Sequence, residues 1–113
     1  MTKLTTHVLD TMKGLPAPGI RIEIYRQDSE GWTKIDTVVT NQDGRTDNAL
    51  LQGSEYKAGK YQLIFYVGAY FAQSEDPSFL DDIVIRFGLS DPTSHMHVPL
   101  LVSPYGFSSY RGS

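Results

Sequence analysis

The sequence contains no cysteine among its 113 residues, and this absence removes several kinds of chemistry. A chain without thiols forms no disulfide bond, has no thiolate nucleophile and offers no cysteine-based metal site. The sequence also lacks any apolar run close to the roughly 20 residues that a membrane-spanning helix requires. We therefore expect neither a disulfide-stabilised scaffold nor a membrane partner.

Positive charge is also scarce. The chain has 10 lysines and arginines against 13 aspartates and glutamates, which gives a formal net charge of −3. Because nucleic-acid binding needs a basic surface, this balance argues against a nucleic-acid partner. The opening residues, MTKLTTHVLD, contain no hydrophobic signal segment. The expected location is therefore the cytoplasm, although the sequence leaves open whether a leader has been removed.

The remaining composition is that of an ordinary globular protein. Hydrophobic residues make up 40% of the chain and charged residues 20%, which does not fit a disordered chain. A chain of 113 residues is long enough to bury a core without covalent staples. We therefore expect one domain that covers residues 1–113.

Much of the chain shows the two-residue alternation of half-buried β-strands. In Ile20–Tyr25, for example, isoleucines alternate with Arg21, Glu23 and Tyr25. The predicted strands are Leu4–Leu9, Ile20–Tyr25, Trp32–Thr40, Lys60–Val67, Ile83–Leu89 and His95–Val102, with shorter candidates at Ala49–Gln52 and Gly106–Tyr110. Gly68–Glu75 is the one predicted helix. Asp10–Gly19 is predicted to be a loop, because it holds two prolines and two glycines.

Short strands separated by turns predict an all-β fold. We expect a two-sheet sandwich or barrel of seven to eight strands with one short helix. The inward positions of the strands predict a core made of Val8, Ile20, Ile22, Ile24, Ile35, Leu63, Phe65, Ile83, Ile85, Phe87, Val98 and Leu100. A slip of one residue in register would exchange the two faces of a strand, so these assignments depend on the register.

The three histidines all lie opposite predicted core positions. His95 and His97 alternate with the apolar face of their strand, and His7 lies opposite Val8. Histidine suits proton transfer near neutral pH, since its unperturbed pKa is about 6.5. Together with Arg45 in a tight turn, the histidines indicate a surface groove.

Each of these residues also has a simpler interpretation. His7 could be a solvated strand residue, Arg45 a plain turn residue and the C-terminal residues a frayed end. His95 and His97 could bind zinc, but a His-X-His pair is a weak signal because no third ligand is near in the sequence. The residue pattern alone therefore predicts a sandwich with a histidine-lined groove and no specific reaction.

Three blocks of sequence carry a more specific resemblance. They are LTTHVLDTMKGLPAPGI at Leu4–Ile20, TNQDGRTD at Thr40–Asp47 and HMHVPLLVSPYGFSSYRGS at His95–Ser113. In these blocks the chain resembles the 5-hydroxyisourate hydrolases, the enzyme branch of the transthyretin-like family. The terminal YRGS is the most specific feature, because the hormone-carrying transthyretins share the SPY segment but lack this tetrapeptide.

The resemblance implies a fold, an assembly and a reaction. The fold is a transthyretin-like sandwich, and the assembly is a homotetramer, a dimer of dimers with its sites at the dimer–dimer interface. The substrate is 5-hydroxyisourate, the product of urate oxidation in purine degradation. Water activated by a histidine adds across its cyclic amide and gives 2-oxo-4-hydroxy-4-carboxy-5-ureidoimidazoline. No metal and no organic cofactor are expected.

The resemblance also implies which residues form the site. The expected catalytic residues are His7, Arg45, His97 and Ser113, and the expected substrate-binding residues are Tyr110, Arg111 and Gly112. One histidine would act as general base, and Arg45 would stabilise developing negative charge. His95 matches the family's site less clearly. The alternative function is a carrier for a small aromatic ligand, against which the paired histidines and the YRGS tail argue.

Overall fold

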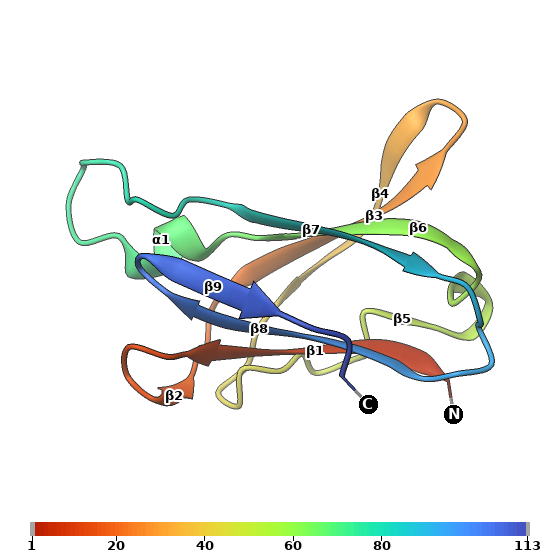
Figure 1. The fold of residues 1–113 in the computed structure, drawn as a ribbon, viewed down its shortest axis with the longest axis horizontal. Helices are drawn as coiled ribbons and strands as arrows, with labels where there is room; N and C mark the ends of the chain where they lie inside the picture. Colours follow the sequence, from red (N-terminus) through yellow and green to blue (C-terminus); the bar gives the residue numbers. More distant parts are fainter. Residues whose placement is uncertain (1, 113) are drawn as a thin grey trace.

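The computed structural model describes residues 2–112, which form two β-sheets packed face to face (Figure 1). Sheet A contains β1 (Lys3–Asp10), β2 (Leu15–Pro16), β5 (Leu51–Gln52), β8 (Met96–Ser103) and β9 (Gly106–Ser109). Sheet B contains β3 (Arg21–Asp28), β4 (Gly31–Val39), β6 (Gly59–Phe65) and β7 (Ile83–Leu89). The strand order is β2-β1-β8-β9 in sheet A, where β5 also pairs with β1, and β4-β3-β6-β7 in sheet B.

The predicted all-β sandwich is confirmed, with differences at its periphery. The sequence predicted a loop without regular structure at Asp10–Gly19, yet Leu15 and Pro16 pair with the end of β1 as strand β2. A proline is tolerated there because β2 lies at the edge of sheet A. Residues 2–112 therefore form nine strands, two of which are only two residues long.

The helix begins one residue earlier and ends sooner than the sequence predicted. Helix α1 covers Val67–Phe71 rather than Gly68–Glu75. Val67 is fully buried, and the Tyr70 hydroxyl donates to the buried Asp10 carboxylate at 2.9 Å. These tertiary contacts hold a segment that is too short to be a stable helix by itself. No helix in the described residues is long and apolar enough to cross a membrane.

The predicted core lies between the two sheets. Nine of its twelve expected members are buried: Val8, Ile20, Ile22, Ile24, Leu63, Phe65, Ile83, Val98 and Leu100. Ile35, Ile85 and Phe87 are only partly buried, because they belong to β4 and β7, the edge strands of sheet B. Each fully buried aliphatic or aromatic side chain contributes roughly 1.5–3 kcal/mol to folding.

The pairing of β1 with β8 determines what lies on the outside of sheet A. The two strands are parallel neighbours, and their register pairs Thr5 with His97 and His7 with Pro99. Because side chains alternate along each strand, these residues share the outer face of sheet A, while Leu4 and its alternates face the core. Two segments far apart in the sequence therefore form one surface.

Candidate active site

Both predicted catalytic histidines lie on the outer face of sheet A. His7 comes from β1 and His97 from the adjacent strand β8, and both are half-buried. The Thr5 hydroxyl oxygen lies 2.9 Å from Nδ1 of His97 and 3.3 Å from Nε2 of His95. Thr5 is not among the residues that the sequence predicts for the site. Its position two residues before His7, on the same face of a strand, was the available signal.

Arg45 approaches this face from the turn Asn41–Arg45. Gly44 has a φ of +73°, a conformation that favours glycine, and a Cβ there would collide with the Val8 carbonyl oxygen. The Val8 N–H donates to the Gly44 carbonyl at 2.8 Å, which holds the turn against β1 beside His7. The close approach that Gly44 permits thus places a guanidinium next to an imidazole.

The C-terminal segment also returns to this face. The Gly112 N–H donates to the His97 carbonyl at 2.7 Å, and the two residues form an isolated antiparallel bridge. A Cβ on Gly112 would lie 2.8 Å from Cδ2 of His97, so a larger residue would displace the imidazole. The Thr5 hydroxyl lies against Nδ1 of the ring, whereas the Gly112 backbone approaches it at Cδ2, the carbon bonded to Nε2.

Both catalytic candidates favour the neutral imidazole. Burial lowers the pKa of His7 below the ordinary 6.5, and the charge of Arg45 lowers it further, while Asp43 opposes the shift. Burial also lowers the pKa of His97, followed by the effects of Arg45, His7 and His95. A neutral imidazole can accept a proton, and a permanent cation beside it can stabilise an anion.

His95 lies in a polar hollow of about 320 Å³. Lys3, Thr5, Arg45 and Asp47 are among the other residues that line it. The structure thus brings His95 together with two groups that also influence His97. Across residues 2–112, no three histidine, aspartate or glutamate side chains are grouped so that they could hold a metal ion.

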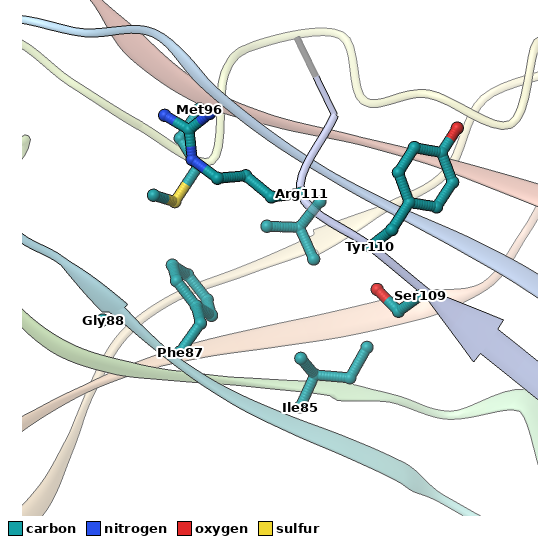
Figure 2. A pocket seen from close by; sticks show the side chains of 8 residues that line it. Ile85, Phe87, Gly88, Met96, Ser109, Tyr110 and Arg111 are labelled. Carbon is teal, nitrogen blue, oxygen red and sulfur yellow. The ribbon is translucent and has the colours of Figure 1, made fainter.

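Arg111 lies apart from the histidines. It lines a cavity of about 240 Å³ between the sheets, together with apolar residues that include Ile85, Phe87 and Met96. Figure 2 shows the Arg111 side chain reaching toward Met96, an inward-facing residue of β8, whereas the adjacent His97 faces outward. The guanidinium of Arg111 and that of Arg45 therefore lie on opposite sides of sheet A.

The other predicted tail residues differ in their placement. Tyr110 is 61% exposed, and its ring points away from Phe87 and Ile85 in Figure 2. Gly112 alone of the three predicted substrate-binding residues contacts a predicted catalytic residue directly. Ser113 lies outside the described residues. The structure therefore brings together His7, Arg45, His97 and Gly112, with Thr5 and His95 beside them.

These features define a class of protein: a transthyretin-like sandwich with two imidazoles and a guanidinium on the outer face of one sheet. The sequence model of the HIUase/Transthyretin family matches residues 4–112, and the chain belongs to this family.

Similar proteins of named function support this family assignment. The chain is 52% identical over 115 residues to the 5-hydroxyisourate hydrolase of Mesorhizobium japonicum, covering 98% of this chain and 92% of that protein. It matches the structure of Klebsiella pneumoniae 5-hydroxyisourate hydrolase with a TM-score of 0.82, at 34% identity and 100% coverage of both chains. It also matches the crystal structure of (S)-allantoin synthase with a TM-score of 0.90 and 44% identity, covering 99% of this chain but only 44% of that longer one.

Proposed function

We propose that this protein is a hydrolase that opens the cyclic amide of 5-hydroxyisourate in urate degradation. The observation that supports this most is the pair of imidazoles, His7 and His97, held in the neutral form beside the Arg45 guanidinium. The substrate is inferred from membership of the HIUase/Transthyretin family and from the 52% identity to a named 5-hydroxyisourate hydrolase. The product is 2-oxo-4-hydroxy-4-carboxy-5-ureidoimidazoline.

The chemistry of the side chains suggests their roles. His7 or His97 accepts a proton from water as the water oxygen bonds to the amide carbon of the six-membered ring. The carbonyl oxygen then carries a negative charge, which Arg45 stabilises. The ring C–N bond breaks as the tetrahedral intermediate collapses, and the protonated histidine returns a proton to the departing nitrogen. Atoms and charge balance with one water consumed.

The tail acts through its position beside His97. Gly112 holds the tail on β8, and we assign Ser113 to orienting water or substrate. Tyr110 is assigned to substrate contact, and Arg111 contributes by anchoring the tail from the cavity between the sheets. Truncation after Tyr110 removes Arg111, Gly112 and Ser113, so it tests the roles of these three residues together.

Assembly into a homotetramer, a dimer of dimers, is part of the proposal. The outer face of sheet A would then line a channel between dimers, where water access to the histidines is restricted. Exposed apolar side chains on and near this sheet support such an interface, among them Leu15, Tyr105 and Phe107, which are 58%, 78% and 49% exposed. Sedimentation analysis of the purified protein tests the assembly independently of activity.

The proposed reaction is tested by following the decay of 5-hydroxyisourate spectrophotometrically, with the substrate generated in place by urate oxidase. Wild-type protein and a variant truncated after Tyr110 are compared with the spontaneous decay. We expect fast decay with wild type and near-spontaneous decay with the truncated chain. Fast decay with both would support the hydrolase activity and show that the tail is not part of the site. No acceleration by correctly assembled wild type would overturn the proposal, and binding of a small aromatic ligand in the channel would then support a carrier.

A further inference from the structure

Thr5 contacts two histidines of the site, although neither a threonine side chain nor this position on β1 requires such contacts. Its hydroxyl oxygen lies 2.9 Å from Nδ1 of His97 and 3.3 Å from Nε2 of His95, within hydrogen-bond reach of both. The next residue, Thr6, differs: it faces the core and donates to the Val98 carbonyl at 2.6 Å. The Thr6 hydroxyl therefore bonds to a backbone carbonyl, whereas the Thr5 hydroxyl bridges two imidazoles.

The hydrogen-bond capacity of a hydroxyl restricts what this bridge can do. Thr5 has one proton to donate and two lone pairs that accept. For His97 to use Nε2 as a base, its Nδ1 must carry the proton and donate to Thr5. The Thr5 proton is then available to Nε2 of His95. In the reverse order, Thr5 donates to Nδ1 of His97, and Nε2 of His97 becomes a donor. The tautomers of the two histidines are thus coupled through one hydroxyl.

We propose that Thr5 is a positioning residue that orients the His97 imidazole, directs Nε2 toward the reacting groups and links the tautomer of His97 to that of His95. This inference deepens the proposed hydrolysis and rests on it for its catalytic consequence. Gly112 leaves room for this orientation, because a Cβ at that position would lie only 2.8 Å from Cδ2 of His97.

The charged and titratable neighbours of His97 come from three elements. Arg45 belongs to the turn before β5, His7 to β1 and His95 to the loop residue just before β8, and all three disfavour the imidazolium. The backbone of Thr5 opposes them and raises the pKa of His97. A hydroxyl that accepts from Nδ1 acts in the same direction, because a hydrogen bond to a charged donor is stronger than one to a neutral donor. Loss of the Thr5 hydroxyl should therefore lower the pKa of His97 further.

The test compares Thr5→Val, which keeps the branched shape, with Thr5→Ser, which keeps the hydroxyl. We expect kcat to fall on the order of ten-fold in Thr5→Val, with KM less affected, as is typical when the partner that orients a functional histidine is removed. Thr5→Ser should recover most of this loss. The acid limb of the pH–rate profile should move to lower pH in Thr5→Val. Unchanged kcat in Thr5→Val, or equal losses in both variants, would overturn the proposal.

A readout independent of catalysis separates this inference from the proposed function. Nitrogen-15 NMR of histidine-labelled, assembled protein reports the tautomers of His95 and His97. Thr5→Val should alter both sets of signals, whereas Thr6→Val, the matched control on the same strand, should lower Tm without altering them. If the signals change in Thr5→Val while wild type does not hydrolyse 5-hydroxyisourate, the coupling stands and the proposed function fails. Signals that stay the same in Thr5→Val would contradict the coupling.

Discussion

The outer faces of the two sheets both carry polar side chains, but they differ in how those side chains are paired. On sheet B, the carboxylate of Glu23 accepts hydrogen bonds from Tyr66 at 2.5 Å and Tyr25 at 2.9 Å, and Lys34 lies 3.7 Å away. Arg21 stacks over the Tyr66 ring at 4.1 Å. Hydrogen bonds from Tyr66 and then Tyr25 lower the pKa of Glu23, so the carboxylate stays charged and paired.

On sheet A the cation has no such compensation. Within residues 2–112, the Arg45 guanidinium takes part in no ion pair or side-chain hydrogen bond. Its charge acts instead on His7 and His97, whose pKa values it lowers. The contrast teaches that a charged group paired within the chain serves the fold, whereas a cation left unpaired beside two neutral imidazoles can serve a ligand or a transition state.

The largest effect is expected when either imidazole is removed. His7→Asn and His97→Asn should each lower kcat/KM for 5-hydroxyisourate roughly 10²–10⁴-fold, because each removes a group proposed for proton transfer. Steady-state kinetics measures the loss, and thermal unfolding shows whether the fold is retained. If one variant keeps wild-type turnover, that histidine has no part in the chemistry.

A smaller but still large effect is expected for Gly112→Ala. The new Cβ would meet Cδ2 of His97 at 2.8 Å, so the imidazole or the tail must move, and activity should fall on the order of ten-fold or more. Gly106→Ala is the matched control, because no heavy atom lies within 4 Å of the Cβ position there. Equal activity in both variants would show that the tail does not position His97.

The pH dependence should follow the neutral imidazoles. Because burial and Arg45 lower the pKa values of His7 and His97 below 6.5, the base form persists at pH 7. We expect kcat/KM to rise with pH, to reach half its maximum below pH 6.5 and to change little above neutrality. Below the midpoint it should fall about ten-fold per pH unit for each essential base. A midpoint above pH 7 would mean that the working group is not one of these imidazoles.

The smallest effect is expected on the other sheet. Tyr66→Phe removes one donor to Glu23 but leaves Tyr25 and Lys34 in place, so unfolding should become easier by about 1 kcal/mol. Hydrolysis of 5-hydroxyisourate should be unchanged, since this network lies on the opposite face of the sandwich. Urea denaturation measures the first quantity and the decay assay the second. A large loss of activity at retained stability would contradict the claim that the network on sheet B has no part in hydrolysis.

The sequence predicts much of this arrangement because strand alternation is local. The periodicity of Ile20–Tyr25 and Ile83–Leu89 predicts two strands of sheet B and part of the core, and the outward orientation of His97 follows from the inward position of Val98 on the same strand. The partner of β1 could not be predicted, because nothing local specifies a parallel pairing with a strand about ninety residues later. For that reason the bridge from Thr5 to both histidines was missed.

The path of the C-terminal tail also could not be predicted from a local sequence pattern. The signature YRGS groups Tyr110, Arg111 and Gly112, but only Gly112 meets His97, while Arg111 turns into the cavity between the sheets. The helix was misplaced for a similar reason, since burial of Val67 and the contact of Tyr70 with Asp10 determine where it forms. In each case a tertiary contact, rather than propensity, decided the outcome.

The most direct test of the account removes one guanidinium from each face. Arg86 on β7 is the counterpart of Arg45, since it donates to Gln62 at 2.8 Å and lies over the Trp32 ring at 5.1 Å. Arg45→Ala should lower kcat/KM for 5-hydroxyisourate on the order of 10²–10³-fold, as expected for a lost stabilising donor in the transition state. Arg86→Ala should keep wild-type activity and lose only stability. Equal activity in the two variants would contradict the claim that the outer face of sheet A is where hydrolysis occurs.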